Sequence, residues 1–98
     1  MDETEQFHLT IYAAGPVEAL AERLAGIVGV TSVTTITGYW NTGVGVHSQQ
    51  GAKIEGVADP PGIARALGAA QEWLNGSGEP ALLLELHPTF ARRLAPER

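Results

Sequence analysis

Strict alternation of apolar and polar residues near the start of the chain predicts the first strand, residues 7–13. Successive side chains of a strand point to opposite faces, so every second residue shares a face. One face therefore carries Phe7, Leu9, Ile11 and Ala13, and the other carries His8, Thr10 and Tyr12. The segment ends at Gly15-Pro16, which breaks the strand and suits the start of a helix.

Two further stretches repeat apolar residues at the three-to-four spacing of an amphipathic helix. The first covers 17–28 and the second covers 63–74. Asp59 is placed to cap the second helix, with Pro60 in its first turn. The glycine-rich run 75–78 ends this helix.

Three more strands are predicted from β-branched and aliphatic runs: 30–40, 52–58 and 81–87. In the first of these, Val33 and Ile36 have opposite parity. That break in the alternation predicts a bulge, or a strand buried partly on both faces. The last strand is expected to stop at Pro88, because proline cannot donate to a strand ladder.

The element order is therefore β-α-β-β-α-β, which indicates an α+β, ferredoxin-like domain. Because crossovers between strands are right-handed, the simplest packing is a four-stranded antiparallel sheet with both helices on one face. Numbered along the chain, the strands would lie in the order 4-1-3-2. We expect one domain over 1–98, with a disordered acidic N-terminus at 1–5 and a tail at 88–98 that is a candidate short helix.

Composition limits the chemistry. The 98 residues are 44% apolar and 17% charged, as in an ordinary globular domain. The absence of cysteine excludes disulfides, thiolate metal sites and cysteine nucleophiles.

The net charge is -5, and only Arg92, Arg93 and Arg98 approach a basic patch, so nucleic acid is not an expected partner. No apolar run approaches the ~20 residues of a membrane span, and the acidic start does not resemble a secretory signal, which favours a cytoplasmic protein without a membrane partner.

One face of such a sheet carries no helix. The residues expected there are His8, Thr10, Tyr12, Leu83, Glu85 and His87. The apolar members favour coverage by a partner subunit, and the alternative is a solvated polar face. Antiparallel pairing of the first and last strands would bring His8 near His87 and Glu85 opposite Thr10. These groups are candidates for a divalent metal or for proton transfer, against chance placement on a polar face.

The aromatic pair Tyr39-Trp40 stands where a strand meets the glycine-rich and polar segment 41–50, which we expect to be a loop. Rigid aromatics beside an adaptable loop are common at binding surfaces. Gly43 and Gly45 lie between two strands, so they permit a turn and do not form a phosphate loop. The candidate ligand-binding residues are Tyr39, Trp40, Asn41, His47, Gln49, Gln50 and Arg65, with Arg92 as an alternative source of charge.

Catalytic signatures are missing from the sequence. It contains no Ser-His-Asp order in a supporting context, no paired carboxylates at a plausible separation and no metal motif of fixed spacing. We therefore assign no catalytic residue and expect no cofactor.

Two short motifs, Tyr39-Trp40-Asn41 and Lys53-Ile54-Glu55, combine with the element order in a way that resembles the CutA and PII-like proteins. The resemblance implies a trimer with ligand clefts between subunits, where strand ends and the loop meet. The chain differs from that pattern in two places. His87-Pro88 follows the last strand instead of preceding it, and the segment 41–50 is short and lacks basic residues.

The interpretation that these observations favour is a small, non-catalytic, oligomeric ligand-binding protein, either a sensor or a sequestering protein. Its site would lie at subunit junctions near 39–50, in a trimer or a dimer, and a small anionic or nucleotide-like ligand is compatible with it. A second interpretation is a protein-interaction module, in which this loop and the tail residues Phe90 and Leu94 grip another chain. A third is a small dimeric enzyme that uses His8, His47 or His87.

Overall fold

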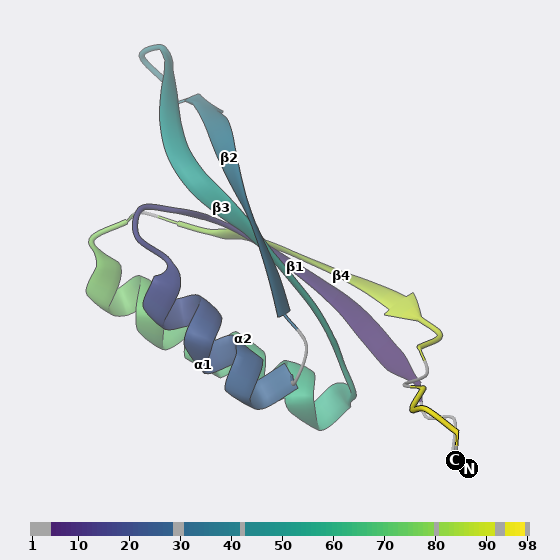
Figure 1. Ribbon diagram of the computed structural model, residues 1–98. Helices are drawn as coiled ribbons and strands as arrows, with labels where there is room; N and C mark the ends of the chain where they lie inside the picture. The colour runs from purple at the N-terminus through teal and green to yellow at the C-terminus, as the bar shows by residue number, and fades with distance from the viewer. Residues whose placement is uncertain (1–4, 29–30, 42, 80, 92–93, 98) are drawn as a thin grey trace.

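The chain forms four strands and two helices in the predicted order (Figure 1). A computed structural model describes residues 5–28, 31–41, 43–79, 81–91 and 94–97. The elements are β1 (Gln6–Ala14), α1 (Glu18–Val28), β2 (Thr31–Asn41), β3 (Val46–Ala58), α2 (Pro60–Ser77) and β4 (Leu83–Thr89). Neither helix in the described part of the chain combines the length and hydropathy needed to cross a membrane.

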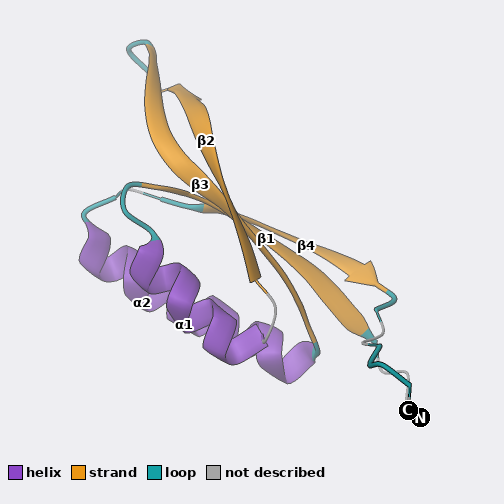
Figure 2. Ribbon diagram, viewed as in Figure 1, coloured by secondary structure: helices purple, strands orange, loops and turns teal. Residues whose placement is uncertain are grey.

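The strands form one antiparallel sheet in the order β2-β3-β1-β4, and both helices cover the same face of it (Figure 2). This arrangement confirms the predicted ferredoxin-like α+β fold and its strand order 4-1-3-2. The sheet is strongly twisted, as the sterics of L-residues require.

The core lies between the helices and the covered face of the sheet. In its centre Ile11 of β1 pairs with Ile54 of β3 and with Leu84 of β4. From the helix layer, α1 contributes Leu20 and Leu24, while α2 contributes mainly alanines. The fully or nearly buried members are Leu9, Ile11, Ala13, Val17, Leu20, Leu24, Ala52, Ile54, Ala58, Ile63, Ala66, Ala69 and Ala70. Burying each of the larger side chains contributes about 1.5–3 kcal/mol.

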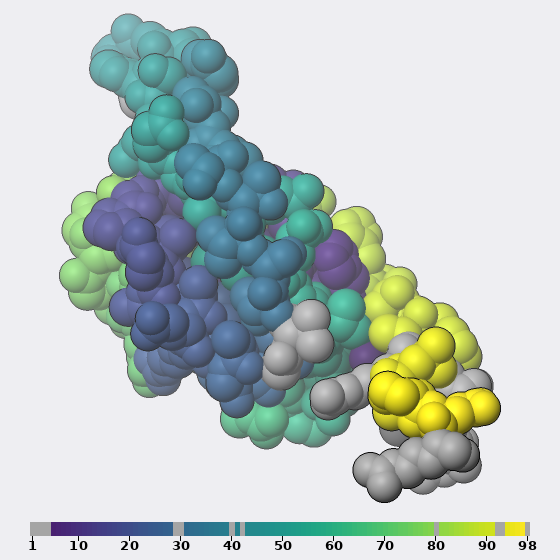
Figure 3. All heavy atoms as spheres, in the orientation of Figure 1, coloured from purple at the N-terminus to yellow at the C-terminus, as the bar shows by residue number. Residues whose placement is uncertain are grey.

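The hairpin formed by β2 and β3 extends beyond the rest of the molecule (Figures 1 and 3). The pairing of β3 with β1 ends at Gly51, so β3 is paired only with β2 from residue 50 back to its start. We call residues 37–50 the arm. The whole chain measures 58 × 22 × 22 Å, and Tyr39 and Val44 in the arm are 74% and 93% exposed.

Strand β2 differs from both structures that the sequence predicted for it, a bulge or burial on both faces. The register between β2 and β3 runs without interruption from Thr31–Gly56 to Asn41–Val46, so β2 contains no bulge. Nor is β2 buried on both faces, because Val33 is 49% exposed and most of the strand is accessible. The parity break instead reflects an edge strand with little burial on either face.

Most of the expected loop at 41–50 is strand. Residues 46–50 belong to β3, and the connection between the strands is confined to 42–45, of which Thr42 lies outside the described residues. Gly43 and Gly45 adopt positive φ in this turn, as a tight hairpin connection requires. The backbone N–H of Gly43 donates to Asn41 Oδ1 at 2.9 Å, which fixes the start of the turn.

Helix α2 begins as predicted. Asp59 has extended backbone angles, Pro60 follows it, and the Asp59 Oδ1 atom accepts from the Gly62 N–H at 2.8 Å. The helix ends at Ser77, and its C-cap residue Gly78 has left-handed backbone angles.

Replacing the cap gives a first testable expectation. Asp59→Ala removes the acceptor for the Gly62 N–H and should lower the free energy of unfolding by about 1 kcal/mol. Chemical denaturation measures the change. Asp59→Asn keeps an acceptor oxygen and serves as the matched control, so an equal loss in both variants would contradict the assigned role of the cap.

Strand β4 runs through Pro88 to Thr89 and does not stop before the proline. This is possible because β4 is an edge strand, where a residue without an N–H interrupts no ladder on the outer side. The residues described beyond it, 90–91 and 94–97, belong to no helix or strand. Of the expected disordered segment 1–5, only Glu5 is among the described residues.

Candidate functional site

A cleft of about 530 Å³ lies at the base of the arm, between the first turns of α1 and strands β2 and β3. In the space-filling view, α1 and β2 lie next to each other on the face below the arm (Figure 3). The lining residues are Gly15, Val17, Glu18, Ala21, Glu22, Val33, Thr35, Gln50, Gly51 and Ala52. The first turns of α1 and the outer strand β2, which are in contact, form two sides of the cleft.

The walls of the cleft are mainly apolar, and two polar side chains, Thr35 and Gln50, face it from the sheet. Its charged members are Glu18 and Glu22, both on α1. None of the lysine or arginine side chains in the described ranges lines it. The cleft therefore has an apolar interior and a negative rim.

Two glutamines connect the arm to the body of the molecule. Gln50 Nε2 donates to Thr37 Oγ1 at 3.2 Å, which joins β3 to β2 at the first pair of the arm. Gln49 Nε2 donates to Glu79 Oε1 at 3.5 Å, which joins the arm to the segment after α2. The Gly15 N–H also donates to the Gln50 carbonyl oxygen at 3.4 Å. These bonds hold the arm where it borders the cleft.

Of the residues predicted to bind a ligand, the structure places Gln50 in the cleft and Gln49 next to it. The others are more distant along the arm. Tyr39, Asn41 and His47 are exposed arm residues.

The remaining predicted residues are Trp40, Arg65 and Arg92. The backbone of Trp40 pairs with His47, but the Trp40 side chain lies outside the described part of the structure. Arg65 is exposed on α2 and does not line the cleft. Arg92 lies outside the described residues. The role of Arg65 as a source of charge at a junction between subunits stays a prediction.

Sequence reasoning missed the contribution of α1. Glu18 and Glu22 lie on the polar side of the amphipathic stretch 17–28, and no pattern in the sequence shows that β2 passes beside that side. The only available signal was their spacing of four residues, which places two side chains on one side of a helix. Val33, read as a parity break, supplies part of the apolar wall.

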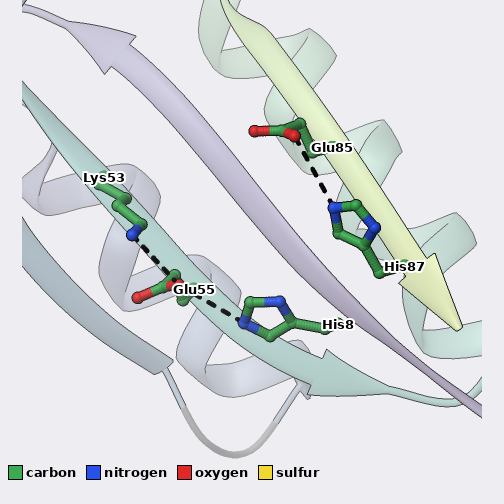
Figure 4. Close-up of polar contacts among 5 residues, drawn as sticks. All are labelled: His8, Lys53, Glu55, Glu85 and His87. Atoms are coloured by element: carbon green, nitrogen blue, oxygen red, sulfur yellow. Dashed lines mark ion pairs between the residues drawn. The ribbon is translucent and has the colours of Figure 1, made fainter. Parts of the chain in front are cut away.

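The uncovered face of the sheet has the register that the sequence predicted. His8 pairs with His87, and Thr10 pairs with Glu85. The side-chain contacts differ from the expected cluster, however (Figure 4). His8 Nε2 lies 3.5 Å from Glu55 Oε1, whereas His87 Nε2 lies 3.7 Å from Glu85 Oε2.

The two histidines thus face two different carboxylates. Lys53 Nζ also lies 3.5 Å from Glu55 Oε1, so this carboxylate is shared between a lysine and His8 (Figure 4). Across the described residues, no group of three or more His, Asp or Glu side chains is arranged to hold a metal ion. The lysine and Glu55 were missed as members of this face, although the alternation Lys53-Ile54-Glu55 places both on one side of a strand.

Comparison with known proteins identifies the fold. No protein-family model and no curated protein sequence matches the chain. Among solved structures, the nitrogen regulatory PII-like protein CPII from Thiomonas intermedia K12, bound to ADP, AMP and bicarbonate, aligns with a TM-score of 0.71 and 12% identity over 96% of this chain and 100% of that one. CutA1 from Oryza sativa aligns with a TM-score of 0.69 and 7% identity over 93% and 85% of the two chains. The GlnK–ATP complex from B. subtilis gives a TM-score of 0.63 and 17% identity over 89% and 85%.

The chain therefore has the fold of the CutA and PII-like proteins, as the resemblance of its motifs and element order predicted. At these levels of identity the likeness establishes the fold alone.

Proposed function

We propose that this protein is a non-catalytic small-molecule-binding protein, a sensor or a sequestering protein, built from several copies of the chain. The ligand site is the cleft at the base of the arm. The observation that carries the proposal is the cleft itself. Its walls are mainly apolar, and one of its polar side chains, Gln50, is held in place by a hydrogen bond to Thr37. Its volume of about 530 Å³ falls within the range usual for small-molecule sites.

Two uncovered surfaces support assembly. The sheet face opposite the helices includes Leu83, which is 54% exposed, beside the half-buried Tyr12. The other surface is the free edge of β2, which has 11 residues and contains neither a charge nor a proline. Edge strands of monomers are usually protected by such residues. A second copy seated on this edge would border the cleft, because Val33 and Thr35 belong to both.

The related folds are consistent with ligand binding at such a place. The CPII structure holds ADP, AMP and bicarbonate, and the GlnK structure holds ATP. We take from them that this fold supports binding of small molecules, and we derive the chemistry of the ligand from the cleft of this chain.

Filling the cleft tests the proposal. Ala21→Phe adds a ring to the cleft wall and should remove most of the small molecule that the purified protein releases on denaturation. Ala25→Phe, at an exposed position one turn further along α1, is the matched control and should retain the wild-type amount. Equal retention in both variants, with folding confirmed by circular dichroism, would contradict a site in the cleft.

A second candidate function rests on the tip of the arm. Tyr39, Val44 and Val46 expose apolar surface there. Apolar side chains exposed on a projecting hairpin suit contact with another protein, since exposed apolar patches mark interaction sites. Capture of one partner protein that is lost on Val44→Ser and Val46→Ser substitution would favour this function over ligand storage.

A further inference from the structure

Glu18 and Glu22, the two carboxylates of the cleft, form no ion pair with any residue that the structure describes. The nearest basic residue along α1 is engaged elsewhere, because Arg23 Nη1 lies 2.6 Å from Glu72 Oε2, and the one lysine, Lys53, lies 3.5 Å from Glu55. Glu18 and Glu22 line the cleft, and no lysine or arginine of the described residues lines it with them. They are one helical turn apart, which puts their Cβ atoms about 5–6 Å from each other.

The surroundings of these carboxylates disfavour an anionic ligand. The start of a helix can hold an anion, because its dipole and free N–H groups attract negative charge. In α1 that position is already taken by Glu18, in the first turn. A phosphate or carboxylate in the cleft would meet two like charges with no cation from the described residues to offset them.

The apolar lining of the cleft selects for an apolar body. It consists of Val17 and Ala21 at the start of α1 and of Val33 and Ala52 in the sheet. Val33 is 49% exposed, so a ligand that covers it removes apolar surface from water. A ligand that complements both the acidic rim and the apolar lining is amphipathic. Its positive group lies near Glu18 and Glu22, and its apolar part lies against β2 and β3.

We propose that the cleft binds an organic cation, a protonated amine attached to an aliphatic or aromatic body. This inference rests on the proposed function and names the ligand class of the same site. The ammonium group interacts with Glu18 and Glu22, and the apolar body packs against Val33 and Ala21. Thr35 and Gln50 supply polar contacts at the far side of the cleft.

The test uses three probes of nearly equal size on the full chain. Phenethylamine is cationic at neutral pH, phenethyl alcohol is neutral and phenylacetate is anionic. We expect phenethylamine to shift the amide NMR signals of Ala21, Val33 and Thr35 in a saturable manner. Each ion pair at such an accessible rim should strengthen binding by up to about fivefold, so the amine should bind more tightly than the alcohol, and phenylacetate should bind least.

Charge-removing variants test the role of the rim. Glu18→Gln with Glu22→Gln should reduce amine binding to that of the alcohol and leave alcohol binding unchanged. Glu97→Gln removes one charge from the exposed tail and is the control that should leave all three affinities unchanged.

The outcomes separate the ligand class from the proposed function. Preference for phenylacetate, or for ATP, with shifts at the same cleft residues would overturn the cationic ligand and leave the site standing. A lack of amine response at the cleft would also overturn the cationic ligand. If, in addition, no small molecule were released from the purified protein, the proposed function would fall with it.

Discussion

Gly51→Ala is expected to destabilise the protein by about 3 kcal/mol, at the upper end of the usual cost of overpacking. A Cβ atom at this position would lie 2.5 Å from the carbonyl oxygen of Ala13. This oxygen belongs to the backbone of β1, one of the two inner strands of the sheet, and backbone cannot move aside as a flexible side chain can. Because Gly51 also lines the cleft and marks the point where the arm leaves β1, the same change should shift the cleft residues.

Gly68→Ala is the matched control for this prediction. Gly68 lies inside α2, and a Cβ atom there would have no neighbour within 4 Å. The same substitution should therefore stabilise the protein by about 0.5–1 kcal/mol, since alanine favours the helix more than glycine does. Urea unfolding of both variants measures the difference. Similar effects of the two substitutions would show that the backbone contact at Gly51 does not matter.

Leu24→Ala is expected to cost about 3–4 kcal/mol, a large fraction of the stability of a domain of this size. Leu24 is 1% exposed and lies on the face of α1 that packs on the core. Its replacement removes buried apolar area and leaves a cavity that the surrounding helices and sheet fill only in part.

The control for this core prediction is Leu94→Ala. Leu94 is 80% exposed in the tail, so the same substitution should change stability by no more than about 0.5 kcal/mol. Thermal and denaturant unfolding report both values. A tail variant as damaging as the core variant would mean that the tail is covered, for example by another copy of the chain.

The core elements could be predicted from the sequence because burial imposes a period on them. β1 alternates because one of its faces meets the helices, and α1 repeats apolar residues because one side of it meets the sheet. The register that places His8 opposite His87 followed from the same alternation, combined with the expected strand order. Where burial is strong on one side, the pattern of residues is informative.

The second strand of the arm, residues 46–50, could not be predicted in this way. Residues 46–50 form a strand that is exposed along its length, so no burial selects apolar residues at alternate positions. The polar run His47-Ser-Gln-Gln consequently resembles a loop. The hydrogen bonds that make it a strand come from β2, which is a tertiary contact.

The candidate site was predictable only in part. Of the candidates that the sequence offered, Gln50 lines the cleft, and it was a candidate because polar residues beside rigid aromatics are common at binding surfaces. Sequence reasoning missed Glu18 and Glu22, because their role depends on how α1 lies against the edge strand. Its assignment of Arg65 concerns a junction between subunits and stays a prediction; within one chain Arg65 is exposed on α2.

Native mass spectrometry of the purified full chain, followed by denaturation and identification of released molecules, tests the central claim most directly. It reports the oligomeric state and the bound ligand in one measurement. The account predicts an assembly of more than one copy that carries a small molecule, and the Ala21→Phe variant should have lost most of that molecule. A bare monomer at all concentrations, with no released molecule, would contradict the account.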